Sequence, residues 1–314
     1  MTNAITNTIE VRKLDRIHDF DIIHSQGTHC LYQDIITAQS CHKAVVEQFK
    51  KERNILYKTL KTFNLRSNVC IAMEWYNYTK HRYKRIIALT KRTKNEIMHY
   101  FNVPSEDITI IPNGVDTLDF SPKNSKLFRD EIRKKHNIDD NDVVLIFVGY
   151  EFMRKGLRHV VNALPIITEK NVKVLVVGDD NPQPYKKLAI QQAVADKIIF
   201  AGRSADIKQY YAASDIFIFP TSYESFSMAT LEAVASGLPI IATKVSGTDE
   251  LIVDGKNGFF IKRDERDIAE KVNQMLKNNL IKQMGREARK TAENYSWEKV
   301  AEKIMKLYNE IVIS

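Results

Sequence analysis

Two glutamates, Glu224 and Glu232, are separated by seven residues in the segment PTSYESFSMATLEAVASGLP at 220–239. A carboxylate that accepts hydrogen bonds from two hydroxyl groups is a common way to bind a vicinal diol, such as the edge of a ribose or a hexose. The pair therefore indicates a ligand with two such diols, as a nucleotide sugar has. A short helix is expected over about 228–236, because Ser225 to Ser227 can cap its start and Gly237 with Pro239 ends it.

A structural role for the two glutamates is the alternative. Glu224, just before the helix, would favour the positive end of the helix dipole, and Glu232 would lie on a solvated face. The alternative fits Glu232 poorly, because this residue lies in an otherwise apolar stretch, LEAVASGLP. Both interpretations place Glu224 before the helix and Glu232 within it.

Two cations follow another apolar run. In GYEFMRKGL at 149–157, Gly149 ends the run and Arg154 and Lys155 come at the start of the next helical stretch. Cations beside the free N–H groups of a helix start suit a diphosphate, although a solvated basic pair is the more common outcome. Neither GxxxxGK[ST] nor GxGxxG occurs in the chain, so the two commonest nucleotide fingerprints are absent.

The elements that position these residues alternate between strand-like and helical patterns. Up to residue 115 we expect strands at 21–24, 35–38, 86–90 and 108–112, with helices near 42–63 and 92–101. IPNGVD at 111–116 carries a turn signal, and beyond it we expect strands at 143–149, 172–178, 197–202, 215–220, 239–243 and 258–261. Their continuous apolar runs predict strands buried on both faces. Ligands of such sheets bind beyond the carboxyl ends of the strands, where both acidic and basic segments fall.

Composition bounds the class of protein. The chain has 314 residues, of which 44% are hydrophobic and 27% charged, so two soluble globular domains are expected. Its apolar runs are too short to cross a bilayer, and the first residues lack the apolar core of a secretion signal. Three cysteines without a CxxC pair favour reduced thiols and a cytoplasmic location.

The net charge of +8 is concentrated in residues 43–94, which hold 14 Lys and Arg but 3 Glu. Aromatic residues are interleaved with these cations, so the region could bind an anionic membrane surface or an acidic acceptor. Solvated helix faces explain the charge equally well. Nucleic acid is not expected as a partner, because no nucleic-acid-binding motif accompanies the charge.

The chain resembles the family-four retaining glycosyltransferases of GT-B fold in five segments taken together: IPNGVD, VGYEFMRKGL, the Glu224–Glu232 segment, EAVASGLPIIAT and DGKNGFFI. GYEFMRKG and TAQSCHKA further resemble the lipopolysaccharide-core glucosyltransferases within that family. The resemblance implies an α/β fold of two Rossmann-like domains facing a cleft. We expect an acceptor-side domain at 1–115, a nucleotide-sugar-binding domain at 116–295, and a last helix at 296–314 that returns to the first domain.

The resemblance also implies roles for particular residues. The donor would be a nucleoside diphosphate sugar, with UDP expected, and neither a metal nor a cofactor would be needed. Arg154 and Lys155 would neutralise the diphosphate, Glu232 would hold the ribose, and Glu224 would hold the donor hexose. The remaining donor contacts would come from Gly149, Arg203, Ser225, Phe226, Ser227 and Met228. The acceptor would be a glycan, lipid or lipopolysaccharide-type molecule of the cell envelope, reached from the cytoplasmic face of the membrane.

Three features of the sequence depart from the family pattern. Ser227 stands where the family usually has Gly, which places a Cβ beside the sugar. Only 20 residues precede DIIHSQG, so the first domain is expected to be shortened, and a partner chain would then complete it. Where the family carries a strand-end His near the sugar, this chain has Gln39, with His42 three residues later. His42 could take the catalytic place or cap a helix.

Two other functions fit the same residues. A non-catalytic subunit would bind the nucleotide sugar without turnover unless a second chain were added. A GT-B-fold epimerase would isomerise the nucleotide sugar without an acceptor, but the paired glutamates resemble the transferases more closely.

Overall fold

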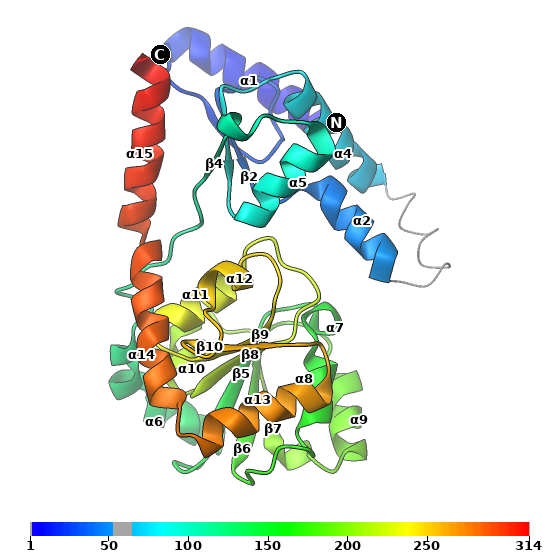
Figure 1. Cartoon of the computed structure of the whole chain (residues 1–314), viewed down its shortest axis with the longest axis vertical. Coiled ribbons are helices and arrows are strands. Elements are labelled where there is room, and N and C mark those ends of the chain that lie inside the picture. The colour runs from blue at the N-terminus through cyan, green and yellow to red at the C-terminus, as the bar shows by residue number, and fades with distance from the viewer. Residues whose placement is uncertain (1, 53–64, 314) are drawn as a thin grey trace. The chain divides into compact units, whose positions relative to one another are not determined.

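The computed structural model describes residues 2–52 and 65–313, and the chain divides into two compact units. Unit 1 comprises residues 1–113 and 300–314, and unit 2 comprises residues 114–299 (Figure 1). The boundaries predicted from the sequence lie after residues 115 and 295. The difference at the second boundary arises because helix α15, Trp297–Ile313, begins in unit 2 and contributes most of its length to unit 1.

Unit 1 is built on a parallel sheet of four strands in the order β1-β2-β3-β4. The strands are His24–Gln26, Ile35–Ala38, Arg85–Ala88 and Ile108–Ile110. One face of the sheet packs against α2 (His42–Glu52), α4 (Leu65–Thr79) and α5 (Lys91–Phe101) through a cluster that includes Tyr78, Ile97 and Phe101. On the other face, Val300, Leu307 and Ile311 of α15 pack against Ile35, Ile87 and Ile111.

Unit 1 also shows where the sequence prediction was wrong. The first strand is His24–Gln26 rather than 21–24. The helix expected near 42–63 is observed as α2 over His42–Glu52, and its remainder lies outside the described residues. Helices α1 (Thr2–His18) and α4 were not predicted. In α1 the apolar pattern gave no signal, because Ile9, Leu14 and Ile17 remain exposed.

Unit 2 is built on a parallel sheet of six strands in the order β10-β9-β8-β5-β6-β7. The strands, in chain order from β5 to β10, are Val143–Val148, Val172–Val177, Ile198–Gly202, Ile216–Phe219, Ile240–Thr243 and Gly258–Ile261. All six fall within the predicted ranges. β8 and β9 are buried along their whole length, as their continuous apolar runs predicted. The strand order reverses between β5 and β8, which is where open α/β sheets bind ligands.

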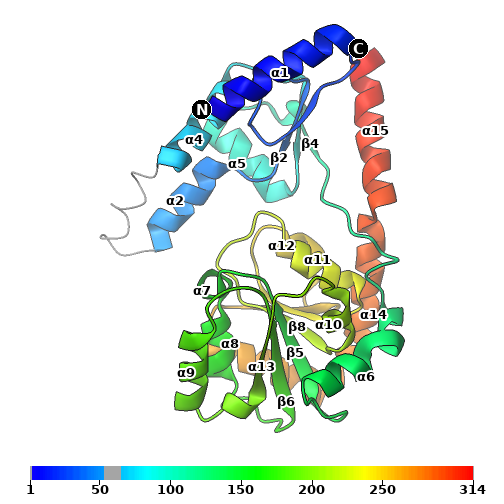
Figure 2. The same ribbon diagram turned by 180° about the vertical axis from the view of Figure 1, so that it is seen from behind.

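Helices cover both faces of this sheet (Figure 2). The core is formed by aliphatic and aromatic side chains of the strands and of α8, α9, α13 and α14. In chain order, the helices of unit 2 are η2 (Pro122–Asn124), α6 (Ser125–Lys135), α7 (Phe152–Lys155), α8 (Leu157–Ala163), α9 (Gln183–Gln191), η3 (Ala195–Lys197), α10 (Lys208–Ala212), α11 (Met228–Ala235), α12 (Thr248–Leu251), α13 (Glu265–Lys277), α14 (Ile281–Ala292) and η4 (Glu293–Tyr295).

Candidate functional site

The loops after β5, β8 and β9 lead into α7, α11 and α12 at the same end of the unit 2 sheet (Figure 1). These loops carry most of the residues that the sequence singled out. A backbone hydrogen bond from Ser222 to the carbonyl of Arg154, 3.0 Å long, joins the loop after β8 to α7. Residues far apart in the chain therefore lie in one site.

Arg154, Lys155 and Glu224 form a compact cluster of charges. Oε1 of Glu224 accepts hydrogen bonds from Nη1 of Arg154 at 3.0 Å and from Nζ of Lys155 at 3.4 Å. The same oxygen accepts from the hydroxyl of Thr221 at 3.2 Å. Arg154 also donates to the carbonyl of Tyr223 and, at 2.8 Å, to the exposed carboxylate of Glu151. The structure thus brings together the cations and one of the two acids that the sequence assigned to a single ligand.

Burial governs the electrostatics of this cluster. Only 10% of the Lys155 side chain is exposed, and its ammonium lies 4.4 Å from the centre of the Phe219 ring. Loss of hydration lowers the pKa of Lys155, although Glu224 opposes the shift. Burial also disfavours the charge of Arg154, but Glu224 and Glu151 outweigh it and raise the pKa of this group. Glu151 is 53% exposed, so its charge is screened by water, and the inner part of the cluster has two cations around the single carboxylate of Glu224. This excess of positive charge can be neutralised by an anionic ligand.

Gly149 makes room for Lys155. It has a φ of +135°, and a Cβ at this position would lie 2.5 Å from Cε of Lys155. We expect Gly149→Ala to displace the Lys155 ammonium and to weaken the binding of a nucleoside diphosphate at least about tenfold, in line with the loss of a charge-assisted contact. Calorimetric titration of UDP measures the effect.

Gly202→Ala is the matched control for Gly149→Ala. Gly202 also has a positive φ, +74°, but a Cβ there would meet no atom within 4 Å. Both substitutions place a Cβ on a residue of positive φ, which costs about 1–3 kcal/mol, while only the first displaces Lys155. Equal affinities of the two variants for UDP would show that Gly149 does not shape the site.

Arg263 supports these loops and was not among the residues predicted from the sequence. Its guanidinium donates to the carbonyls of Met153 at 2.6 Å, Arg154 at 3.0 Å and Pro220 at 3.1 Å. It therefore ties α7 to the loop after β8. The available signal was its place two residues after β10, at the same carboxyl edge of the sheet as the other site loops.

Helix α11 begins as predicted, with Ser227 as its cap. The hydroxyl of Ser227 accepts a hydrogen bond from the N–H of Thr230 at 3.2 Å, and the residue is 2% exposed. Gly247 lies against this turn, since a Cβ there would be 3.0 Å from both Cα of Phe226 and N of Ser227. The loop is also held by the hydroxyl of Ser246, which donates to the carbonyl of Ser225 at 3.1 Å. The side chain of Ser227 is thus engaged in the cap.

Glu232 lies in α11, with its carboxylate bonded to Tyr211 of α10. The tyrosine hydroxyl donates to Oε2 of Glu232 and to the carbonyl of Ala229, both at 3.0 Å. Burial raises the pKa of Glu232 to about 7, with the Tyr211 hydrogen bond acting in the opposite direction. The shift makes the carboxyl group responsive to pH near neutrality. Tyr211 was not among the residues predicted from the sequence.

Arg203 and His42 lie outside these contacts. Arg203 is an exposed residue of the loop after β7. His42 belongs to unit 1, where it begins α2, and its backbone N–H donates to the buried carboxylate of Glu74 at 2.6 Å. Glu74 also accepts from the N–H of Lys43 at 3.1 Å, so it is Glu74 that caps this helix. Within residues 2–52 and 65–313, no group of three or more His, Cys, Asp or Glu side chains could hold a metal ion.

The fold and the site agree with comparisons to known proteins. The model of the family "Glycosyl transferases group 1" matches residues 128–294, more than half of the chain, and "Glycosyltransferase Family 4" matches residues 2–118. The chain therefore belongs to the group 1 glycosyltransferases. Its two Rossmann-like units are those of the GT-B fold, as the sequence motifs predicted.

Individual relatives share about a quarter of the sequence. The uncharacterized glycosyltransferase MJ1607 of Methanocaldococcus jannaschii is 28% identical over 231 residues, which is 71% of this chain and 59% of that protein. The lipopolysaccharide glucosyltransferase WaaG of Escherichia coli is 25% identical over 237 residues, 74% of this chain and 62% of WaaG. The chain thus spans about three-fifths of the length of the curated relatives that it matches.

Solved structures show the same fold. A crystal structure of WaaG superimposes with a TM-score of 0.77 at 24% identity and covers 95% of this chain and 80% of that one. Anabaena HepE in complex with UDP superimposes with a TM-score of 0.70 at 22% identity and covers 88% of this chain and 79% of that one.

Proposed function

We propose that the protein is a retaining glycosyltransferase that moves a hexose from a nucleoside diphosphate sugar, with UDP as the nucleoside diphosphate. The observation that carries the proposal is the cluster formed by Arg154 and Lys155, the last two residues of α7, and by Glu224, which precedes α11. It joins an anion site to a buried acid that can accept hydroxyl groups. Crystallised complexes of HepE with UDP and with UDP-glucose support the choice of donor.

The reaction that we propose follows from the charge of the leaving group. When the glycosidic bond to the donor breaks, negative charge develops on the β-phosphate, and Arg154 with Lys155 stabilises it. The N–H groups of Phe226, Ser227 and Met228 at the start of α11 add to this effect. Because the protein's own cations supply this compensation, we propose that no metal ion is required. Retention would follow if the acceptor attacks from the side of the departing phosphate, which takes its proton.

In this proposal Glu224 and Glu232 hold the two sugars of the donor. Without ligand, Glu224 is bonded to Arg154 and Lys155. A diphosphate that attracts these cations would leave the Glu224 carboxylate available to the hexose hydroxyls. Glu232 would hold the ribose, His42 of unit 1 is the candidate catalytic histidine, and Arg203 would lie beside the base.

A donor screen tests this function. We expect UDP to raise the melting temperature and one of UDP-glucose, UDP-galactose, UDP-N-acetylglucosamine or GDP-mannose to be hydrolysed slowly by the chain. The proposed acceptor is a glycan, lipid or lipopolysaccharide-type molecule of the cell envelope. Failure of every nucleoside diphosphate to protect the protein would overturn the proposal, and donor isomerisation in a chromatogram would identify an epimerase instead.

The raised pKa of Glu232 predicts a pH dependence of donor binding. The ribose hydroxyls require the ionised carboxylate as acceptor, whereas below about pH 7 the unliganded group is protonated. UDP should therefore bind about tenfold more weakly at pH 6 than at pH 8, as one linked proton requires. Calorimetric titration across this range measures the change. Glu232→Gln should flatten it apart from the contribution of the UDP phosphates, and an unaltered profile in that variant would contradict the assignment.

The raised pKa of Glu232 also affects the free energy of unfolding. With rising pH this free energy decreases, whereas the affinity for UDP increases. A folded-state pKa above the unfolded value of 4.5 means that the folded chain retains a proton that the unfolded chain has lost. Stability from this group is present below pH 4.5 and declines as the pH rises towards 7. A bound donor that favours the ionised group would reduce the decline.

A peripheral location at the inner face of the membrane, through residues 43–94, is part of the proposal. In unit 1, Lys80 lies 5.4 Å from the centre of the Trp75 ring, and 51% of Trp75 is exposed. An exposed aromatic ring beside a cation suits the headgroup region of an anionic membrane. None of the described helices is long and apolar enough to cross a bilayer. A partner chain that completes unit 1 is a further proposal, testable by co-purification.

A further inference from the structure

Helix α7 is a single turn, and its last two residues are the cations Arg154 and Lys155. The N–H groups of Lys155 and Gly156 close this turn, each with a hydrogen bond of 3.0 Å to a carbonyl four residues before it. One turn is not stable by itself in water, because its few hydrogen bonds do not offset the backbone freedom that it loses. The placement of the two cations therefore depends on the contacts that hold α7 to the rest of unit 2.

The first residue of α7 is held by its backbone and by its ring. The N–H of Phe152 donates to Oδ2 of Asp180, in the loop after β6, at 2.7 Å. The ring of Phe152 is 1% exposed and packs against the rings of Phe147 and Tyr185. These contacts fix the start of the turn, while the cations lie at its end.

The end of α7 is held by Arg263. Nη2 of this arginine donates to the carbonyl of Met153 at 2.6 Å and to the carbonyl of Arg154 at 3.0 Å. The last carbonyls of a helix lack partners within the helix, and a basic side chain that bonds to them is one of the ways in which helix ends are stabilised. Here the basic side chain comes from a distant segment, two residues after β10.

The same guanidinium also bonds to the end of β8. Nε of Arg263 donates to the carbonyl of Pro220 at 3.1 Å. Gly156, directly after α7, lies against this carbonyl, since a Cβ there would be 2.2 Å from the Pro220 oxygen. The chain continues from Pro220 to Glu224 within four residues. Arg263 thus fixes the helix that carries the cations relative to the loop that carries the acid.

The shape of the guanidinium suits this task. Arginine presents its donors in a rigid planar fork, whereas a lysine ammonium is a compact charge at the end of a flexible chain. The three carbonyls belong to two separate segments, and a planar fork can bond to both segments at once. We therefore expect the geometry of the Arg263 side chain, and not its charge alone, to determine the position of α7.

We propose that Arg263 is a positioning residue for the diphosphate of the donor. It holds the end of α7 so that Arg154 and Lys155 meet the phosphate groups, and it acts through these two residues instead of contacting the ligand itself. A binding group has to be held within about 0.5 Å of its productive position, and a displacement of about 1 Å can cost about 100-fold in activity. The inference rests on the proposed function, because it assigns the diphosphate to these cations.

Calorimetric titration of UDP tests the inference. Arg263→Ala should raise the dissociation constant at least about tenfold, because the cations lose their placement. Arg263→Lys keeps the charge but not the fork, so its dissociation constant should rise nearly as much. A chain that is only less stable would bind fewer UDP molecules per chain, with the dissociation constant of the parent. An unchanged dissociation constant in Arg263→Ala, or parent-like binding by Arg263→Lys, would overturn the inference.

A mutant cycle with the two cations shows whether Arg263 acts through them. In the Arg154→Ala/Lys155→Ala background there are no cations left to place, so adding Arg263→Ala should not weaken UDP binding further. Residues that act as a unit are non-additive in this way, whereas independent residues have additive effects. An equal loss of affinity in the parent and in the double-alanine background would show that Arg263 acts independently of the cations, and would overturn the inference.

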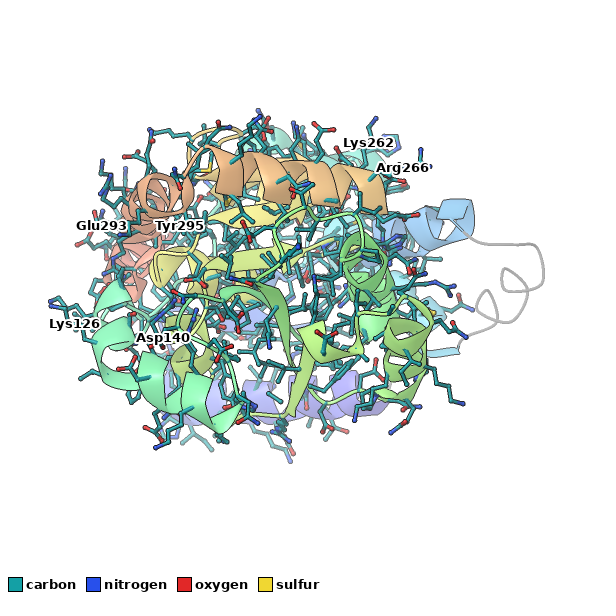
Figure 3. All side chains as sticks on the ribbon, turned by 90° about the horizontal axis from the view of Figure 1, so that it is seen from below. Lys126, Asp140, Lys262, Arg266, Glu293 and Tyr295 are labelled. Carbon is teal, nitrogen blue, oxygen red and sulfur yellow. The ribbon has the colours of Figure 1, made fainter. Side chains whose placement is uncertain are left out.

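Arg266→Ala is the matched control for Arg263→Ala. Arg266 is an exposed residue of α13, three positions later in the chain, and Figure 3 shows it at the rim of the view. The substitution removes the same charge without removing a bond to α7, so the variant should bind UDP like the parent. If both variants lost affinity equally, the general positive charge of this region would explain the result and the inference would fail.

Amide hydrogen exchange of the unliganded chain tests the same role without UDP. In Arg263→Ala, the N–H groups of Lys155 and Gly156 should exchange at least about tenfold faster than in the parent, because α7 opens more often. Unchanged exchange within β5 would show that the fold is preserved. Unchanged exchange within α7 would overturn the inference. If UDP does not bind the parent chain at all, the proposed function fails, while the exchange of α7 still decides whether Arg263 orders these cations.

Discussion

Glu224→Gln should abolish sugar transfer while leaving the chain folded. The substitution keeps the size of the side chain but removes the charge that Arg154 and Lys155 hold at 3.0 and 3.4 Å. The amide cannot accept hydroxyl groups as strongly as the carboxylate, and the hexose loses its anchor. Loss of one preorganised polar group that stabilises the transition state in an active site lowers kcat by about 10²–10³-fold. Transfer from the donor found in the screen, followed by chromatography, measures the loss.

Glu151→Gln is the matched control for Glu224→Gln. Glu151 also pairs with Arg154, at 2.8 Å, but 53% of its side chain is exposed, against 12% for Glu224. Exposed ion pairs contribute about 0–1 kcal/mol, so transfer by this variant should change little. If the Glu224→Gln enzyme retains most of its turnover, Glu224 does not take part in the reaction. If its melting temperature lies far below that of the parent, the transfer by the folded Glu224→Ala variant is measured instead.

Arg133→Ala should cause the largest loss of stability in unit 2. This arginine is 1% exposed and holds Asp215 at 2.8 Å, while its other nitrogens donate to the carbonyls of Ala213, Asp139 and Asp142. Its removal leaves a buried carboxylate and several carbonyls without this partner. Breaking a buried pair from one side costs about 3–5 kcal/mol. Amide hydrogen exchange of β5 and β8 measures the change in the free energy of opening for this unit.

Arg129→Ala separates burial from charge in that experiment. Arg129 binds the other oxygen of the same Asp215, at 2.7 Å, but 27% of its side chain is exposed. We expect a cost of about 1 kcal/mol, because water can replace part of this interaction. Equal costs for the two arginines would contradict the view that the buried guanidinium organises the amino ends of these strands.

The sequence predicted unit 2 well because its signals are local. The six buried strands appear as continuous apolar runs, and Ser227 caps α11 through an i to i+3 contact. The meeting of Arg154, Lys155 and Glu224 was predictable because parallel strands place their carboxyl ends at one edge. Ser227 stands where the family usually has Gly, and its side chain is used to cap α11. The sequence alone shows only that a Cβ is added at this position.

The features that were missed depend on contacts distant in the chain. Tyr211 reaches Glu232 from α10, and Arg263 holds Met153, Arg154 and Pro220 from beyond β10. The contact of Tyr211 has no signature in local spacing, and for Arg263 the sequence shows only its place two residues after β10, not its partners. In unit 1, α1 lacks a clear apolar stripe, so its helical pattern was hidden, and Glu74 caps α2 from the separate helix α4.

The central claim is that the cations after β5 anchor the diphosphate of the donor, and a titration of UDP tests it most directly. We expect UDP to bind the chain with measurable heat and Arg154→Ala/Lys155→Ala to weaken it by about 10²-fold or more, as the loss of two charge-assisted contacts requires. Hydrogen exchange would establish that the variant remains folded. Undiminished affinity of this folded variant for UDP would contradict the claim.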